Sequence, residues 1–208
     1  MDAVLETHEA VDFALWPVAD LPADRLLALS GRLSPPELGT AMAVLACYNN
    51  DLHKREAAEP GADAEAVVEQ VRGLVSAECV MAPGGLRVRD TATGVTVPPG
   101  CCFGLENWRD WLDLLDGAEP WLGHDPTPRV EHVGATVRLW PDEDRPDAFP
   151  IDLPLARLPV LMRSVQDQLA DFLASVEEWA TRYAPPLAAT VVAKLDGDLA
   201  IGAPLRKE

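Results

Sequence analysis

The longest amphipathic pattern of the chain runs from Leu158 to Tyr183. Apolar side chains there recur at alternating spacings of four and three residues, which places them on one stripe of a helix. They are Leu158, Met162, Val165, Leu169, Phe172, Val176, Trp179 and Tyr183. Pro159 suits the first turn of this helix, and Pro185–Pro186 end it. The stripe predicts a central packing helix, and the alternative is a homodimer seam through the Leu158–Tyr183 helix.

The first 76 residues are predicted to form a helical subregion. After a short N-terminal piece we expect one helix near Ala23–Gly31 and a second from Pro36 to about Glu56. The second is indicated by the near-helical spacing of Leu38, Met42, Leu45 and Leu52. A break at residues 59–63 then provides Asp63 as the N-cap of a third helix that ends at Ser76.

From Cys79 onward the pattern alternates with a period of two, which is typical of strands. Cys79–Ala82, Leu86–Arg89 and Gly94–Val97 predict an antiparallel meander, and Arg129–His132 with Thr136–Trp140 predict a hairpin around Gly134. Helices are expected at Leu105–Leu115 and Leu187–Leu195, and an acidic loop at 141–150. The prediction is one α+β domain over 1–208: a small antiparallel sheet packed against helices in 77–208, a helical segment in 1–76, and a long C-terminal amphipathic helix.

The net negative charge of the chain limits the kinds of partner that it is expected to bind. The chain has 34 Asp and Glu against 17 Lys and Arg, a formal net charge of -17. Such a field repels nucleic acid and anionic membrane and speeds encounter with a basic protein. No apolar run approaches the roughly 20 residues of a membrane span, and the N-terminus is acidic, so we expect a cytoplasmic protein. The alternative interpretation of the charge is solubility alone.

Four side chains carry the atoms that zinc prefers: Cys101, Cys102, His124 and His132. Adjacent cysteines do not have the spacing of a recognised site, so buried thiols and surface imidazoles are favoured and no metal or other cofactor is predicted. His124-Asp125 invites comparison with metal phosphohydrolases, but Gly123 and Pro126 place this pair in a turn. A small metal-dependent hydrolase using Cys101, Cys102, His124 and Asp125 stays an alternative.

The Leu105–Leu115 segment supplies the predicted binding surface. As an α-helix it has an apolar face, formed by Leu105, Trp108, Leu112 and Leu115. On another face, Asp110 and Asp113 follow Glu106 at offsets of four and seven residues. Trp121 follows in a turn, where an exposed Trp beside carboxylates is typical of an interface anchor. The predicted partner-binding residues are Glu106, Asp110, Asp113, Trp121, His124 and Asp125. A solvated face and a buried Trp121 are the alternatives.

Over residues 80–180 the order of elements resembles the SMI1/KNR4, or SUKH, superfamily. The resemblance rests on Val97-Pro98-Pro99 before an aromatic helix that closes with Leu115-Asp116-Gly117, then a hairpin, then Asp171-Phe172-Leu173 in an amphipathic segment. It implies an α+β domain that bacteria often use as an immunity protein, which neutralises a toxin by direct binding. The chain departs from the pattern in the Cys101-Cys102 pair, the N-terminal helical segment and the turn at 121–128.

The predicted function is therefore a non-catalytic, acidic, cytoplasmic protein-binding module with an immunity-like role toward a basic partner. The alternatives are the metal-dependent hydrolase and a helix-mediated oligomeric scaffold.

Overall fold

The main sheet is built around the N-terminal strand. The computed structural model describes residues 1–10, 13–50, 64–145 and 147–205. Strands β1 (Asp2–Glu6), β2 (Leu26–Ala28), β3 (Gly84–Arg89) and β4 (Thr96–Val97) form an antiparallel sheet of order β2-β1-β3-β4. Ala3, Val4 and Leu5 are all buried. Because this inner strand is covered on both faces, it has a continuous apolar run instead of an alternating one.

Within residues 1–10 and 13–30, the prediction of a helical segment is wrong except for a short 3₁₀ helix at His8–Ala10. Asp2–Glu6 is a strand, and the segment predicted as a helix near Ala23–Gly31 contains strand β2. Arg25, just before β2, has a left-handed backbone (φ 57°), which a right-handed helix does not allow. The helix at 36–56 is confirmed as α1 (Pro35–Asn49), and its expected continuation to Glu56 lies outside the described residues. Helix α2 (Ala64–Ser76) is confirmed, but its expected cap at Asp63 also lies outside them.

Helix α1 lies in the centre of the fold. Ser34 and Glu37 cap its N-terminus reciprocally, since the Ser34 hydroxyl accepts from the Glu37 N–H and the Glu37 carboxylate accepts from the Ser34 N–H. Every residue from Leu38 to Ala46 is buried, so the helix is covered all round. It contacts α2, α3 and the short 3₁₀ helix η1 (His8–Ala10). The N-terminal region thus shares one core with the sheet.

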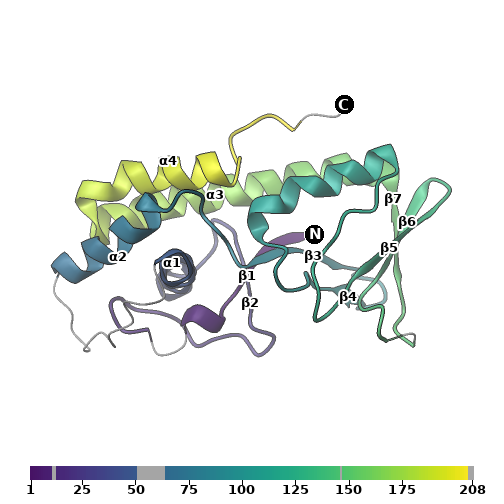
Figure 1. Cartoon of the computed structure of the whole chain (residues 1–208), viewed down its shortest axis with the longest axis horizontal. Helices are drawn as coiled ribbons and strands as arrows, with labels where there is room; N and C mark the ends of the chain where they lie inside the picture. The colour runs from purple at the N-terminus through teal and green to yellow at the C-terminus, as the bar shows by residue number, and fades with distance from the viewer. Residues whose placement is uncertain (11–12, 51–63, 146, 206–208) are drawn as a thin grey trace.

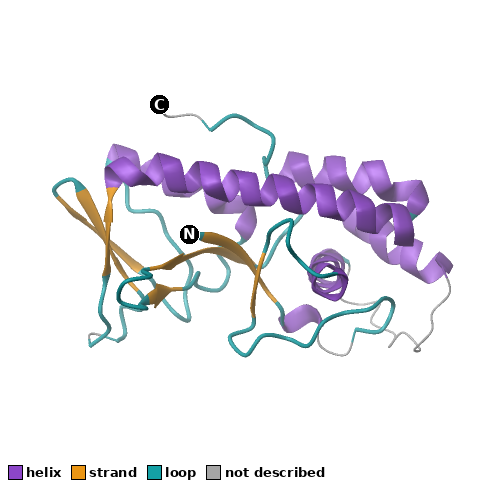
Figure 2. Cartoon of the chain, turned by 180° about the vertical axis from the view of Figure 1, so that it is seen from behind, coloured by secondary structure: helices purple, strands orange, loops and turns teal. Residues whose placement is uncertain are grey.

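Helix α3 (Leu158–Tyr183) has the bounds that the sequence predicted and runs along one side of the molecule (Figures 1 and 2). Seven side chains of its predicted stripe are buried, and Tyr183 is half-buried. The stripe packs against α4 (Ala188–Asp198), α1 and β1 of the same chain. These side chains are therefore not available as a seam for a second copy.

A second sheet lies at the end of the molecule where α3 begins (Figure 1). Its order is β5-β6-β7, from β5 (Arg129–Val133), β6 (Thr136–Trp140) and β7 (Ile151–Pro154). The predicted hairpin is confirmed as β5–β6, whereas β7 was not predicted and the strand expected at Cys79–Ala82 is absent from this described segment. The fold class is α+β, as predicted. Among the described helices, none combines the length and the apolar character needed to cross a bilayer.

Candidate functional site

The helix predicted at Leu105–Leu115 is a 3₁₀ helix, η3 (Leu105–Asp116). A 3₁₀ helix has three residues per turn, so side chains three apart lie in one row. Leu105, Trp108, Trp111 and Leu114 follow this spacing and are all buried. The predicted apolar face is therefore wrong in part: Trp111 and Leu114 belong to it, and Leu115 is only half-buried.

The same geometry divides the predicted acidic stripe. Asp110 and Asp113 share an exposed row, whereas Glu106 lies on another side of η3. The Glu106 carboxylate is turned inward, where its Oε2 accepts a hydrogen bond of 2.9 Å from the Ala82 N–H. Burial raises the pKa of Glu106, against the lowering effect of that bond. Burial also raises the pKa of Asp110, and the charge of Asp113 adds to it.

Glu106 is accordingly expected to be a structural residue. A raised pKa in the folded state means that its contribution to stability is complete at pH below the ordinary Glu value and is lost as pH rises through the folded pKa. Glu106→Gln, which stays neutral and keeps an acceptor for Ala82, should make stability less dependent on pH in this window. Glu106→Ala leaves the Ala82 N–H without its acceptor and should cost about 1–3 kcal/mol. Urea unfolding of both variants at pH 4 and pH 7 measures this difference, and equal losses in both would contradict it.

Two loops distant in sequence cross beside the predicted turn. Cys101 and His124 form an isolated antiparallel bridge, in which the Cys101 N–H donates to the His124 carbonyl at 2.6 Å and the His124 N–H donates to the Cys101 carbonyl at 3.2 Å. The Gly100 N–H also donates to the Leu122 carbonyl at 2.9 Å. A Cβ on Gly100 or on Gly123 would lie within 2.5 Å of the opposing backbone. Both glycines are therefore needed for this close crossing.

The crossing brings three metal-ligand side chains together. The Cys101 Sγ lies 3.0 Å from His124 Nδ1 and 3.4 Å from the Cys102 Sγ. Among the described residues this is the one group of three or more His, Cys, Asp or Glu side chains whose ligand atoms lie within 4.8 Å of one another in the way a metal site requires. We call Cys101, Cys102 and His124 the thiol–imidazole cluster. Asp125 adjoins it, with its Oδ2 3.5 Å from His124 Nδ1.

The remaining predicted residues divide between this site and other places. Trp121 is 57% exposed, and its ring centroid lies 6.2 Å from that of His124. The side chain of Asp125 is 91% exposed. His132, a weak metal candidate, lies outside the cluster, with its Nε2 2.9 Å from the Ala118 carbonyl oxygen. The structure therefore joins Trp121, His124 and Asp125 to the cysteine pair, and it separates Glu106 and His132 from them.

The ionisation of Cys101 limits what the cluster can do by itself. Partial burial, the Cys102 thiol, and the negative charges of Glu6 and Asp125 together raise the pKa of Cys101 to about 11. A thiol in this state is protonated at neutral pH, whereas a nucleophilic cysteine needs a lowered pKa. A cysteine that binds a metal also has to be a thiolate, but a bound metal ion would itself displace the thiol proton, so the raised pKa disfavours direct attack by the thiol more than it disfavours ligand chemistry.

Backbone geometry is the feature of this site that the sequence prediction missed. The backbone of Cys102 is left-handed (φ 65°), so the pair departs from the extended geometry in which neighbouring side chains point to opposite sides. The spacing argument against adjacent cysteines does not take such a backbone into account. One signal was present in the sequence: a glycine directly precedes each of the two bridged residues, Gly100 before Cys101 and Gly123 before His124.

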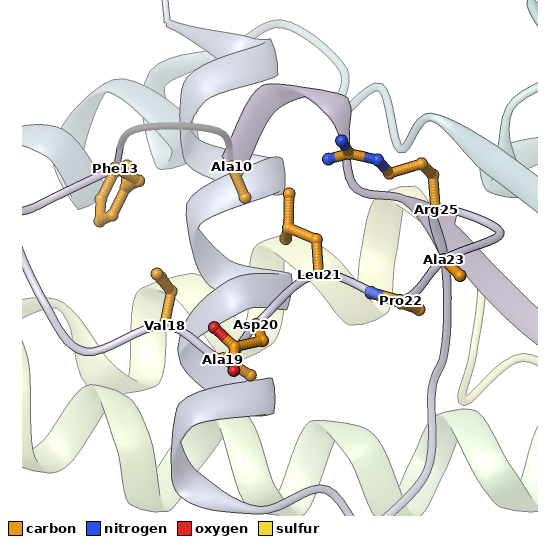
Figure 3. A pocket seen from close by; sticks show the side chains of 9 residues that line it. All are labelled: Ala10, Phe13, Val18, Ala19, Asp20, Leu21, Pro22, Ala23 and Arg25. Carbon is orange, nitrogen blue, oxygen red and sulfur yellow. The ribbon is translucent and has the colours of Figure 1, made fainter.

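A separate hollow of about 470 Å³ lies beside α1, and none of the predicted site residues lines it. Figure 3 shows Phe13, Val18 and Leu21 around it, with the side chain of Asp20 below Leu21 and that of Arg25 above. It is open to solvent. Its mixed lining does not indicate a particular reaction.

Comparison of the chain with protein families, with curated proteins and with solved structures finds no match.

Proposed function

We propose that this protein is a non-catalytic, cytoplasmic binding protein that engages a basic protein partner, with an immunity-like role in which binding neutralises that partner. The observation that carries the proposal is the exposed Trp121 beside His124 and Asp125, in a chain of net charge -17. We call Trp121, His124 and Asp125 the Trp121 turn. An aromatic anchor next to carboxylates matches the chemistry of Arg-rich and Lys-rich surfaces.

We include Asp110 and Asp113 in the proposed surface because both are exposed on η3, which precedes the Trp121 turn in the sequence. Glu106 is not part of the proposed surface, because its carboxylate accepts a hydrogen bond from the Ala82 N–H. The like-charge contribution of Asp113 to the raised pKa of Asp110 is what a cationic partner would relieve. Electrostatic attraction of this kind mainly raises the association rate, and it weakens as salt increases.

The chain offers a matched test of this surface with an oligoarginine peptide as the probe. Asp125→Lys and Glu178→Lys change the net charge equally, but Glu178 is an exposed residue near the far end of α3. If the Trp121 turn is the docking surface, Asp125→Lys should weaken peptide binding more than Glu178→Lys, and the difference should shrink at high salt. Trp121→Ala should weaken binding about two- to fivefold through loss of cation–π contact.

Fluorescence anisotropy of a labelled peptide at low and high salt measures these affinities. Equal losses in the two lysine variants, with no effect of Trp121→Ala, would mean that the peptide follows net charge alone, and the proposed surface would be wrong.

The second candidate is the metal-dependent hydrolase, and the convergence of the thiol–imidazole cluster is the observation that favours it. Such an enzyme needs an ion that activates a water molecule, with an open coordination position. The raised pKa of Cys101 makes the alternative of a direct thiol nucleophile less favourable. Metal binding by the cluster is thus the first requirement of this candidate.

A further inference from the structure

We propose that Cys101, Cys102 and His124 form a binding site for one zinc(II) ion, with the fourth coordination position left to the Asp125 carboxylate or to water. The inference goes beyond the proposed partner binding and does not depend on it. Three observations carry it: the distances within the cluster, the backbone that holds it, and the chemistry of its donor atoms.

The distances are close to those that zinc needs. With Zn–S of about 2.3 Å and Zn–N of about 2.0–2.1 Å, a tetrahedral ion holds two sulfurs about 3.8 Å apart and a sulfur and a nitrogen about 3.6 Å apart. The Cys101–Cys102 Sγ distance is 3.4 Å, and the distance from Cys101 Sγ to His124 Nδ1 is 3.0 Å. The Cys102 Sγ and a ring nitrogen of His124 lie within 4.8 Å of each other. The first two distances are about 0.4 and 0.6 Å shorter than the zinc values, so the donor atoms would have to move apart by about that much to form one face of a tetrahedron.

The backbone holds the ligands in place before any ion arrives. Two hydrogen bonds pair Cys101 with His124 across the loops, and the left-handed backbone of Cys102 accompanies a close approach of the two sulfurs. Ligands that are held near their bound geometry lose less conformational entropy when the ion binds. The spacing in the sequence, which differs from that of common zinc motifs, is therefore not an obstacle here.

The donor atoms select the class of ion. Two thiolates and one imidazole are soft or borderline ligands, which favour zinc over the oxygen-preferring magnesium and calcium. Binding would release the two thiol protons to solvent, and the resulting thiolates would neutralise the charge of a zinc ion, with the negative charges of Asp125 and Glu6 nearby. Half of the His124 side chain is exposed, so the ion would have access from solvent and the fourth position would stay open.

Cobalt(II), a spectroscopic substitute for zinc, tests the proposal on the reduced, chelator-treated full chain. We expect one equivalent of cobalt to give a sulfur-to-cobalt charge-transfer band with the intensity of two thiolates, and zinc to displace it. Cys101→Ser, Cys102→Ser and His124→Gln should each weaken cobalt binding at least about 100-fold. This is a larger loss of affinity than is typical when a residue that only hydrogen-bonds to a metal ligand is replaced.

Two substitutions outside the cluster are matched controls. Cys79→Ser removes an exposed thiol and His132→Gln removes an imidazole, and both should leave cobalt affinity within about twofold of the wild-type value. Circular dichroism identifies any variant that fails to fold, and the wild-type stoichiometry is informative without the variants. A wild-type protein without the charge-transfer band, or one whose band is lost in Cys79→Ser and retained in Cys101→Ser, overturns the proposal. Oligoarginine binding, measured with a chelator present, stays independent of either outcome.

Discussion

Gly123→Ala is expected to lower the free energy of unfolding by about 3 kcal/mol or more and to disrupt the surface of the Trp121 turn. Gly123 has a left-handed φ of 97°, which costs a residue with a side chain about 1–3 kcal/mol. The new Cβ would also lie 2.4 Å from the backbone carbonyl carbon of Gly100, so the two loops would have to separate. Separation would break the bridge between Cys101 and His124. Urea unfolding measures the loss of stability, and cobalt and oligoarginine affinities measure the loss of the site.

The chain contains controls that separate the two causes. Gly134 also has a left-handed backbone (φ 62°), but a Cβ there would meet no atom within 4 Å, so Gly134→Ala should show the conformational cost alone, about 1–2 kcal/mol. At Gly100 the backbone conformation is ordinary and the contact is close, so Gly100→Ala should show the steric cost alone. A Gly123→Ala variant no less stable than Gly134→Ala would mean that the crossing tolerates a side chain.

The elements that the sequence predicted well are those whose pattern is long or sharply bounded. Helix α3 has eight stripe positions and prolines at both ends, so its bounds follow from local rules. The β5–β6 hairpin is equally clear in the sequence, because Gly134 marks the turn between its two strands. Strands β2 and β7 have three and four residues, too few for periodicity to distinguish strand from loop. They form because neighbouring strands supply hydrogen bonds that a local pattern does not contain.

The site could be predicted only in its composition. Trp121, His124 and Asp125 were identified as one turn because they are neighbours in sequence, and they do lie together. The cysteine pair was identified as a metal candidate but rejected on spacing, because its contact with His124 depends on the crossing of two loops. Glu106 was misplaced because an α-helical period was assumed where the buried side chains repeat every three residues. Each error concerns backbone geometry, which residue types alone do not determine.

The Trp121 turn and the thiol–imidazole cluster share His124, so occupancy of one should affect the other. An ion on His124 Nδ1 would replace its contact with Asp125 and hold the imidazole in one orientation beside Trp121. Because the two thiolates would neutralise the ion, the net charge of the surface that is proposed to attract a cationic partner would not change. Zinc is therefore expected to strengthen partner binding by ordering the turn, and partner binding weakened by zinc would contradict this expectation.

Trp108→Ala is expected to cost about 3–5 kcal/mol, the range for removing a large buried aromatic side chain. Trp108 is fully buried, and its Nε1–H donates to the Leu199 carbonyl at 2.8 Å, which ties η3 to the end of α4. Arg109 strengthens this connection with bonds to the Ala200 carbonyl at 2.7 and 3.0 Å. The substitution therefore removes both packing and a hydrogen bond between segments that are distant in sequence.

Trp111 provides a matched comparison for the hydrogen bond. It is buried in the same row of η3, but its Nε1–H has no acceptor among the described residues. Trp108→Phe should cost about 1–3 kcal/mol more than packing alone predicts, because the Leu199 carbonyl loses its donor, whereas Trp111→Phe removes a donor that was already unpaired. Urea unfolding should therefore rank Trp108→Phe below Trp111→Phe in stability. The reverse order would mean that packing around the indole rings, rather than the bond to Leu199, determines how firmly η3 is held.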